Sequence, residues 1–586
     1  MLQNTIDLFR QAPPGLGLAV GAVFIGLFLV LLRLARPKPI PGIPHNVEAA
    51  NSFFGDLPEF RTAPDRREWW VSQVIKHQSP MIQVFLRPFS LPWVFVADHW
   101  EAVDIMTHRA KEFDRADQTI YTFEGVAPSH HIVMHSSNPQ FKRNKELVRD
   151  LMSVNFLQDV GFFPEIYEKF ALLVDLWNNK ARLSNGRPFN ASEDIHNAAL
   201  DIVMAASFGV GLEQSQIAKQ TRELEGASSP GGRDDVFEFK HVPLDEELRC
   251  FTTLTDSILV AVRSPLPRLS HFLYRNLSPT MRRAAAGRDR LRNREIAKSV
   301  ERRRSGNPER CALDNMLARE DVIAEKEGRK PNYYSQVILD ELLGYLVGGH
   351  ETSSSVIRWA CKYLTDDQRA QSLLRKALYE AYPEAAAENR VPTLAEITKN
   401  QHVAYLDGVI EESLRHARTA SITLRQALVD TQILGVHIPK GTTVGMMASG
   451  PGMTTPNTPS LEVDYSKRSA NSKAHRKKVP AFDNSNITEF LPERWLRTQK
   501  TESGEEETVF DPNGGPAQAF GLGPRGCFGK KLAYIELRIF FTMIFWEFKM
   551  NPIKPELRKQ DEKVALSRSP KYVYLSLEKT GPRQSV

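Results

Sequence analysis

The longest apolar stretch of the chain lies close to its N-terminus. Residues 11–32 read QAPPGLGLAVGAVFIGLFLVLL without one charged side chain, and Arg33, Arg36 and Lys38 follow. As a helix this segment is ~33 Å long, enough to cross the ~30 Å hydrocarbon core of a bilayer. A cleaved signal peptide is the alternative, but its apolar region usually has only about 7–15 residues and ends at small residues. The pattern predicts a transmembrane helix over 11–32, with residues 1–10 lumenal and the basic flank cytosolic.

Prolines are dense in the segment that follows, RPKPIPGIP, at residues 36–44. Prolines at this density exclude a helix and favour a stiff, extended spacer. The sequence therefore predicts a basic, proline-rich linker over 33–45 and one large domain over 46–586.

Within this domain, apolar positions mostly recur with a helical period. Long helical patterns cover about 140–300, 334–364, 406–415 and 530–548. Strand-like runs are shorter, at 81–98 and 431–444, where β-branched and aromatic residues are interrupted by prolines and turns. We expect a mainly α fold with small β-sheets. Two polar stretches, 466–485 and 497–515, are predicted to be surface insertions.

Composition excludes several classes of protein. Hydrophobic residues make up 41% and charged residues 25% of 586 positions, which is ordinary for a globular protein and excludes global disorder and collagen. The four cysteines are far apart, so neither a disulfide framework nor a Cys-x-x-Cys zinc site is indicated. Residues 281–304 carry 10 basic and 3 acidic side chains. The local charge of +7 exceeds the net charge of the whole chain, which is +6. One basic helix is weak support for nucleic-acid binding, so we expect a solvated helix.

The strongest chemical signal is the loop FGLGPRGCFG, Phe520–Gly529. Its glycines let the backbone turn tightly and approach a flat ligand. Backbone N–H groups and the start of the following helix would stabilise a thiolate at Cys527, and Arg525 can pair with a carboxylate. This combination suits a haem iron with a cysteine thiolate ligand.

The loop resembles, at every fixed position, the haem-binding signature Phe-x-x-Gly-x-Arg-x-Cys-x-Gly of the cytochrome P-450 family. The resemblance implies the cytochrome P-450 fold and a bound haem b with Cys527 as the axial iron ligand. Phe520, Gly523 and Gly529 would form the haem loop, and Arg525 would contact a haem propionate. With its N-terminal anchor, the chain is most similar to membrane-anchored, microsomal members from filamentous fungi.

Two charged motifs agree with this resemblance. Glu412 and Arg415, in the sequence ESLR, share one helix face; a local surface ion pair is the ordinary interpretation of such a tetrapeptide. Placed before the haem loop, they resemble the family's Glu-x-x-Arg motif, and Arg494 in FLPERW resembles its partner. A buried charge network must be fully paired, so the resemblance implies a structural role for Glu412, Arg415 and Arg494.

The sequence GGHETSSS, residues 348–355, lies inside the long apolar helical pattern. Two glycines and a charged residue are locally unfavourable there, which predicts a distortion of the helix beside a ligand. The segment resembles the family's oxygen-binding groove. Thr352 would then hydrogen-bond to the oxygen or to a water, and Glu351 would relay protons from solvent.

Two weaker matches concern the haem propionates. Arg425 precedes a turn in a segment similar to the family's propionate-binding strand. In an early helix, where the family usually has Trp-x-x-x-Arg, this chain has Phe141 and Lys145. Lysine lacks the planar fork of arginine, so the contact expected from Lys145 is weaker.

The resemblance implies a monooxygenase that activates O₂ and inserts one oxygen atom into a lipophilic small molecule, in secondary metabolism. The expected partners are an NADPH-cytochrome reductase in the membrane and cytochrome b5, with the enzyme held in the endoplasmic reticulum membrane and its catalytic domain in the cytosol. Two alternatives remain: a haem-thiolate isomerase or dehydratase that needs no reductase, and a non-catalytic haem protein. The acid–alcohol pair argues against both.

The pocket for the substrate is expected between residues 119–133, 343–347 and 420–424, which are mostly apolar or small. A basic docking face for the reductase is predicted on the thiolate side of the haem. Opposite charge on a partner would steer it to this face. Its members are Lys142, Arg143, Arg149, Lys530 and Lys531.

Overall fold

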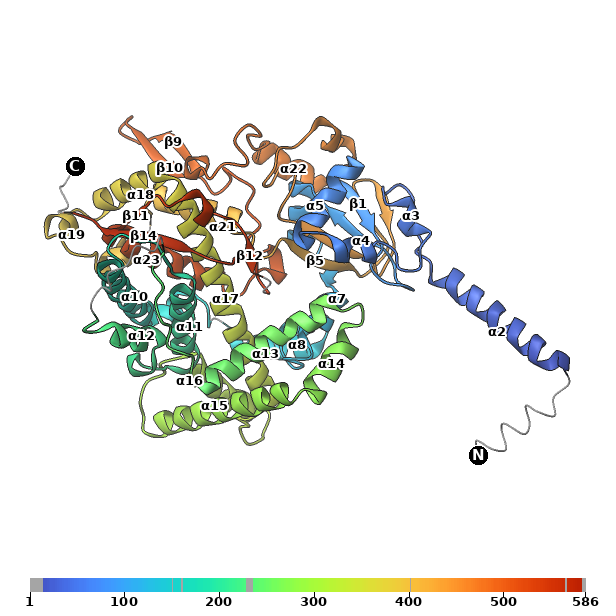
Figure 1. Cartoon of the computed structure of the whole chain (residues 1–586), viewed down its shortest axis with the longest axis horizontal. Helices are drawn as coiled ribbons and strands as arrows, with labels where there is room; N and C mark the ends of the chain where they lie inside the picture. The colour runs from blue at the N-terminus through green and yellow to red at the C-terminus, as the bar shows by residue number, and fades with distance from the viewer. Residues whose placement is uncertain are drawn as a thin grey trace.

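The computed structural model describes residues 14–149, 151–159, 162–227, 236–400, 402–563 and 566–581. Helices dominate (Figure 1). Strands β1 and β5 lie close to the N-terminal segment, whereas β9, β10, β11 and β14 lie in another part of the body (Figure 1). Helix α17 (Gln336–Asp366) runs through the middle of the body (Figure 1). The predicted class, mainly α with small sheets, is therefore confirmed.

The apolar N-terminal segment forms helix α2 (Pro14–Ala35), which projects away from the body (Figure 1). The predicted lumenal residues 1–10 lie outside the described residues. Over the described part of the chain, no helix reaches the combination of length and apolar character that spans a bilayer. A helix is thus confirmed at this position, and its predicted role as a membrane span is not.

A five-stranded sheet joins two distant parts of the chain, in the order β1-β2-β8-β5-β3. Strands β2 and β8 are parallel, and the other neighbouring pairs are antiparallel. The sheet places residues near 115 beside residues near 425. Its strands are β1 (Met81–Val84), β2 (Trp93–Val96), β3 (Phe113–Arg115), β5 (Ile422–Ala427) and β8 (Thr443–Met447).

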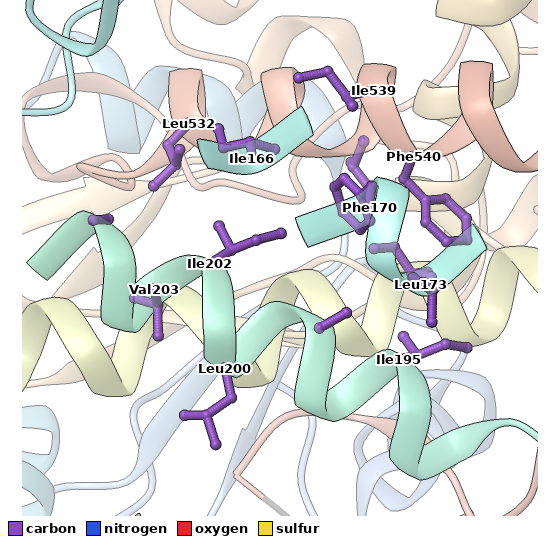
Figure 2. Packing of buried hydrophobic residues seen from close by; sticks show 14 of the residues in the cluster. Ile166, Phe170, Leu173, Ile195, Leu200, Ile202, Val203, Leu532, Ile539 and Phe540 are labelled. Carbon is purple, nitrogen blue, oxygen red and sulfur yellow. The ribbon is translucent and has the colours of Figure 1, made fainter. Parts of the chain in front are cut away.

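The main core lies where helices α10, α11, α17, α21 and α23 pack together. Figure 2 shows Phe170 of α10 and Phe540 of α23 side by side, with Ile202 of α11 directed toward the same space. Each fully buried side chain of this size contributes about 1.5–3 kcal/mol relative to exposure. The bounds are α10 Phe162–Ser184, α11 Ser192–Phe208, α21 Ala404–Ala417 and α23 Lys530–Glu547.

Further helices surround this core. The basic stretch at 281–304 is helical, as predicted, within α15. The other helices are α3 (Val47–Ala50), α4 (Leu57–Thr62), α5 (Arg66–His77), α6 (His99–Thr107), α7 (Asp117–Phe123), α8 (Pro139–Val148), α9 (Val154–Asp159), α12 (Gln216–Leu224), α13 (Glu246–Arg263), α14 (Pro267–Leu277), α15 (Pro279–Arg304), α16 (Ala312–Lys326), α18 (Gln368–Ala381), α19 (Pro383–Ala387) and α20 (Leu394–Lys399).

Small sheets complete the fold. Strand β14 pairs with both β11 and β4, and three two-stranded sheets pair β6 with β7, β9 with β10, and β12 with β13. Their bounds are β4 Phe189–Asn190, β6 Thr431–Ile433, β7 Val436–Ile438, β9 Leu496–Lys500, β10 Glu506–Phe510, β11 Phe548–Asn551, β12 Glu562–Lys563, β13 Ser569–Pro570 and β14 Tyr574–Lys579.

Both predicted polar insertions lie at the surface. The first contains helix α22 (Ala470–Lys478), and the second forms the hairpin of β9 and β10. Helix α22 is fixed to α6, because the guanidinium of Arg468 donates two hydrogen bonds of 2.6 Å to Asp98 at the start of α6. The indole of Trp100 also donates to the carbonyl of Val479, at 2.9 Å.

The glycines and charge at 348–355 predicted a distortion of the central helix beside a ligand. Helix α17 runs without a break through this segment. The hydroxyl of Thr352 donates to the carbonyl of Gly348 one turn earlier, at 2.7 Å, and such a bond often accompanies a bend in a helix. The distortion stays a prediction.

Candidate active site

The loop before α23 presents Cys527. Cys527 is exposed, whereas the other three cysteines of the chain are buried. Its backbone N–H donates to the carbonyl of Phe520 at 2.8 Å, which closes the loop. Gly523 has a φ of +68°, and a Cβ added there would lie 2.0 Å from the carbonyl oxygen of Met106 on α6. Only glycine fits this close approach, so the loop is held firmly against α6.

Backbone amides surround the sulfur of Cys527. Although the residue is partly exposed, the protein atoms around its sulfur desolvate the Cys527 thiol and raise its pKa, while hydrogen bonds from the N–H groups of Gly529 and Lys530 act in the opposite direction. These amides belong to the start of α23, where the helix dipole favours negative charge. Donors of this kind suit a sulfur that is anionic when it binds a metal ion.

Three arginines converge beside the loop, from three different elements. Arg525 donates from Nε to Asp114 at 2.7 Å and from Nη2 to the carbonyl of Met134 at 2.6 Å. Arg115 and Arg425 lie on the neighbouring strands β3 and β5. Each of the three keeps one buried nitrogen without a partner: Nε of Arg115, Nη2 of Arg425 and Nη1 of Arg525.

The electrostatics of this arginine cluster call for an anionic ligand. Burial and the charges of the neighbouring arginines lower the pKa of Arg115 to about 9 and that of Arg425 to about 10. Asp114 alone supplies less negative charge than the three guanidinium groups require. Orphaned, buried donors of one sign fit the two propionates of a haem, so the residues present fit this cofactor.

Arg115 and Asp114 were not among the predicted site residues. Both lie on the short strand β3, and nothing in its local sequence, FDR, distinguishes it from a surface strand. The predicted Lys145 lies on the exposed side of α8, with its ammonium 5.4 Å from the ring centre of Phe141. Arg525 stacks on that same ring at 4.2 Å. Phe141 thus supports Arg525, and its ring also receives the ammonium of Lys145.

The predicted acid–alcohol pair lies on α17. Gly348 and Thr352, one turn apart, are exposed although most of the neighbouring residues of this helix are buried. Glu351 is half-buried and accepts a hydrogen bond from the hydroxyl of Ser567 at 3.4 Å. Its other carboxylate oxygen lies 3.7 Å from Nδ1 of His196 on α11. The structure therefore opens one face of the helix at Thr352 and surrounds Glu351 with polar groups.

The structure brings Glu412, Arg415 and Arg494 together. Arg415 donates to both oxygens of Glu412, at 2.7 and 2.8 Å, and Nε of Arg494 lies 3.6 Å from Glu412. The indole N–H of Trp495 and the backbone N–H of Leu491 each donate a further hydrogen bond of 2.9 Å to this carboxylate. These bonds hold the pKa of Glu412 far below its usual range despite burial. The network fixes α21 to the segment that carries Arg494.

A cavity of about 510 Å³ adjoins the predicted substrate region. It lies between the segment after α7 and helix α14. The predicted segment 119–133 contributes Tyr121, Glu124, Gly125 and Pro128 to its lining. Helix α14, which the sequence did not indicate, contributes Arg268, Leu269, His271, Phe272 and Arg275.

The predicted docking residues are all exposed, which is compatible with a surface that meets a partner. Arg143 forms an ion pair with Glu327, and Arg149 one with Glu146 at 3.4 Å. The two lysines of the set on α23 lie in its first turn, directly after the haem loop. The exposed members are Lys142, Arg143, Arg149, Lys530 and Lys531.

Comparison with known proteins identifies a matching family model and several similar proteins. The family model described as Cytochrome P450 matches residues 46–453 and 482–576. The residues between these two ranges include α22, which agrees with the prediction of an insertion.

Several curated relatives match over nearly their whole length. Cytochrome P450 monooxygenase TRI13 of Fusarium sporotrichioides is 35% identical, over 95% of this chain and 99% of that protein. Cytochrome P450 monooxygenase xilC of Penicillium rubens is 33% identical, over 96% of each. Among solved structures, the heme domain of cytochrome P450DA has a TM-score of 0.64 at 18% identity, covering 93% of this chain and 98% of that one. This last likeness shows the shared fold.

Proposed function

The chain belongs to the cytochrome P450 family and is a haem-thiolate monooxygenase; from this premise, we propose that it oxidises a lipophilic small molecule of fungal secondary metabolism. The support is the close similarity to monooxygenases of Fusarium and Penicillium over nearly the full chain. Electrons would come from NADPH through a membrane-bound flavoprotein reductase, with cytochrome b5 as a second donor.

We assign the haem contacts to this chain's residues as follows. Cys527 would bind the iron through its sulfur, supported by the backbone amides that follow it. Arg115, Arg425 and Arg525 would pair with the propionates through their unpartnered nitrogens. When bound, the haem supplies activation of O₂ and transfer of one oxygen atom, and thiolate donation favours O–O cleavage.

Proton supply would fall to the pair on α17. The hydroxyl of Thr352 is on the exposed face of the helix, and in the resting protein it donates to Gly348. Rotation of this side chain would let it hold a water or O₂ instead. Glu351 would bring protons to Thr352, its neighbour in the chain, because its carboxylate adjoins polar groups of α11 and of the C-terminal segment. Positioned groups of this kind typically contribute ~10²–10⁴-fold to a rate.

The substrate would enter through the cavity between the segment after α7 and helix α14. Leu269 and Phe272 give that cavity apolar lining, while Arg268 pairs with Glu124 across it. A lipophilic substrate that partitions into a bilayer fits such a lining.

Attachment to the endoplasmic reticulum membrane through residues 11–32, with the body in the cytosol, remains part of the proposal. It rests on the uncharged apolar run and on the basic residues that follow it.

The observation that carries this function is the exposed Cys527 beside three arginines that each keep one buried nitrogen without a hydrogen-bond partner. The first test is the carbon monoxide difference spectrum of the dithionite-reduced protein, followed by reconstitution with an NADPH-dependent reductase. We expect a strongly red-shifted Soret band and NADPH oxidation that depends on the reductase. Product formation without NADPH and reductase would indicate the isomerase or dehydratase alternative.

A further inference from the structure

A polar cluster lies on the side of Glu351 that faces α11. His196 of α11 and His350 and Glu351 of α17 each direct a nitrogen or oxygen to the same point, with these atoms within 4.8 Å of one another. The two imidazole rings meet edge to face, with centroids 5.3 Å apart. Two of these residues, His196 and His350, have no part in the function described above.

His350 is buried and its orientation is fixed. Its Nδ1 donates to the carbonyl of Leu346 at 2.8 Å, so its Nε2 remains as an acceptor. Gly349 permits the close packing of this turn on α11, since a Cβ there would lie 2.5 Å from the side chain of Val203. His350 is therefore held in one orientation beside the other two residues of the cluster, and it is buried away from solvent.

His196 differs from the buried His350, because 20% of the His196 side chain is exposed to solvent. The exposed fraction of the Glu351 side chain is smaller, at 12%. Its Nδ1 is buried, has no hydrogen-bond partner and lies 3.7 Å from the carboxylate of Glu351. A bridging water or a small side-chain rotation closes a gap of this size. One nitrogen of His196 thus lies close to the acid, and part of the His196 side chain is exposed to solvent.

Several charged groups face this histidine. Arg358 on α17 and Lys563 on β12 are the cations, and Asp256 on α13 interacts with both His350 and Glu351. Glu193, on the same helix as His196, is paired with His241 at 2.8 Å. Burial and the neighbouring cations lower the pKa of His196 well below its ordinary value, so the ring is neutral near pH 7. A neutral imidazole can accept a proton at one nitrogen and release one from the other.

We propose that His196 is a positioning residue that passes protons from solvent to Glu351. Nε2 accepts a proton from a solvent hydronium ion while the Nδ1–H proton passes to the Glu351 carboxylate, which leaves a water, a neutral carboxyl group and the other neutral tautomer of His196. The first tautomer returns when the ring rotates toward solvent, where Nε2 gives its proton to one water and Nδ1 takes one up from another. This inference rests on the proposed role of Glu351 as the acid that supplies Thr352.

The test compares two substitutions at His196 with a matched control. His196→Phe keeps the ring shape and removes both nitrogens, and His196→Gln keeps hydrogen bonding but cannot pass a proton. His241→Phe changes a nearby, partly exposed histidine that contacts Glu193 and not Glu351. The carbon monoxide difference spectrum and thermal unfolding of each holoenzyme establish that the variants fold.

The first readout needs no turnover. Infrared difference spectra between two pH values, assigned with Glu351→Gln, report the carboxyl band of Glu351. We expect this band to shift in both His196 variants and to stay unchanged in His241→Phe.

The second readout is the amount of hydrogen peroxide formed per NADPH oxidised. It is measured with the lipophilic compound that gives the largest spin-state shift of the haem in a binding screen. We expect oxygen transfer per NADPH to fall about tenfold in both His196 variants, less than the full effect of ~10²–10⁴ for a direct acid–base group, because water replaces part of the route. A larger solvent isotope effect should accompany this fall.

Two negative results have different meanings. If Glu351→Gln impairs oxygen transfer while both His196 variants behave like wild type in coupling and in the infrared band, the relay through His196 is wrong and the role of Glu351 stands. If Glu351→Gln leaves oxygen transfer per NADPH oxidised unchanged, the proposed role of Glu351 is wrong. The proposed relay through His196 is then wrong as well.

Discussion

Arg115 on β3 and Arg425 on β5 lie directly opposite each other in neighbouring antiparallel strands. Like charges in this relationship destabilise a sheet, and both side chains carry buried nitrogens without partners. Their lowered pKa values have the same origin, burial together with repulsion from neighbouring arginines. The protein therefore stores unfavourable electrostatic energy at the position proposed for the haem propionates, which would relieve it when bound.

A substitution at Arg425 should consequently have opposite effects on the two forms of the protein. In Arg425→Gln, the haem-free protein should gain about 0.5–1 kcal/mol in unfolding free energy, because one member of the like-charged pair is gone. The haem-loaded protein should release its cofactor faster. Thermal unfolding of the haem-free form and haem transfer to an acceptor protein measure the two effects. Arg425→Lys, which keeps the charge, serves as the control; equal destabilisation of both forms would contradict this account.

Removal of the predicted iron ligand gives a direct spectroscopic result. Cys527→Ser should lose the strongly red-shifted Soret band of the reduced carbon monoxide complex, because a hydroxyl does not replace the thiolate as an electron donor. Cys250→Ala, which changes a buried cysteine on α13, should keep the band. If Cys527→Ser keeps it, another residue binds the iron.

The parts of the site that sequence revealed are those whose chemistry is local. Cys527 and its glycines form one contiguous loop, and Glu412 lies one helical turn from Arg415. Such groups are constrained by residues next to them in the chain, so a short pattern is enough to identify them. The predicted fold class and helices depended likewise on local periodicity.

The parts that sequence could not reveal depend on long-range register. Arg115 would become a haem contact because β3 pairs with β5, more than three hundred residues later. Asp114 meets Arg525 and His196 meets Glu351 by tertiary packing alone. No local pattern carries such information.

The Glu412 network should set the stability of the fold at acid pH. Glu412→Gln leaves Arg415 and Arg494 buried without their carboxylate, which should cost about 3–5 kcal/mol in unfolding free energy. In wild type the pKa of Glu412 is depressed in the folded state, so its contribution is present above its unfolded pKa and is lost as pH falls toward the folded value. Denaturant unfolding at pH 7 and at pH 4 measures this difference.

The substitution Glu384→Gln, on an exposed turn of α19, is the matched control and should change stability by less than about 0.5 kcal/mol. The network interpretation would be wrong if Glu412→Gln and Glu384→Gln unfolded at the same denaturant concentration.

Charge reversal should test the docking face. Lys530→Glu together with Lys531→Glu should slow reductase-supported turnover at low ionic strength, because both lysines are exposed beside the haem loop, where they would steer an acidic partner. The difference from wild type should shrink as salt is added, since salt screens surface charges. Lys376→Glu on α18 reverses an exposed charge on another helix and is the control. Unchanged turnover at low salt in the double variant would remove these lysines from the docking face.

The hydroxyl of Thr352 forms a hydrogen bond within α17 and is also proposed to take part in proton supply. Its hydroxyl is satisfied in the resting protein by the carbonyl of Gly348, so it must exchange this bond to hold a water or O₂. Thr352→Ala should leave folding and the carbon monoxide spectrum intact but divert consumed NADPH into hydrogen peroxide. Thr352→Ser keeps the hydroxyl and should restore most of the coupling. If alanine and serine were equally uncoupled, the lost methyl group would be the cause; if alanine remained fully coupled, Thr352 would have no part in proton supply.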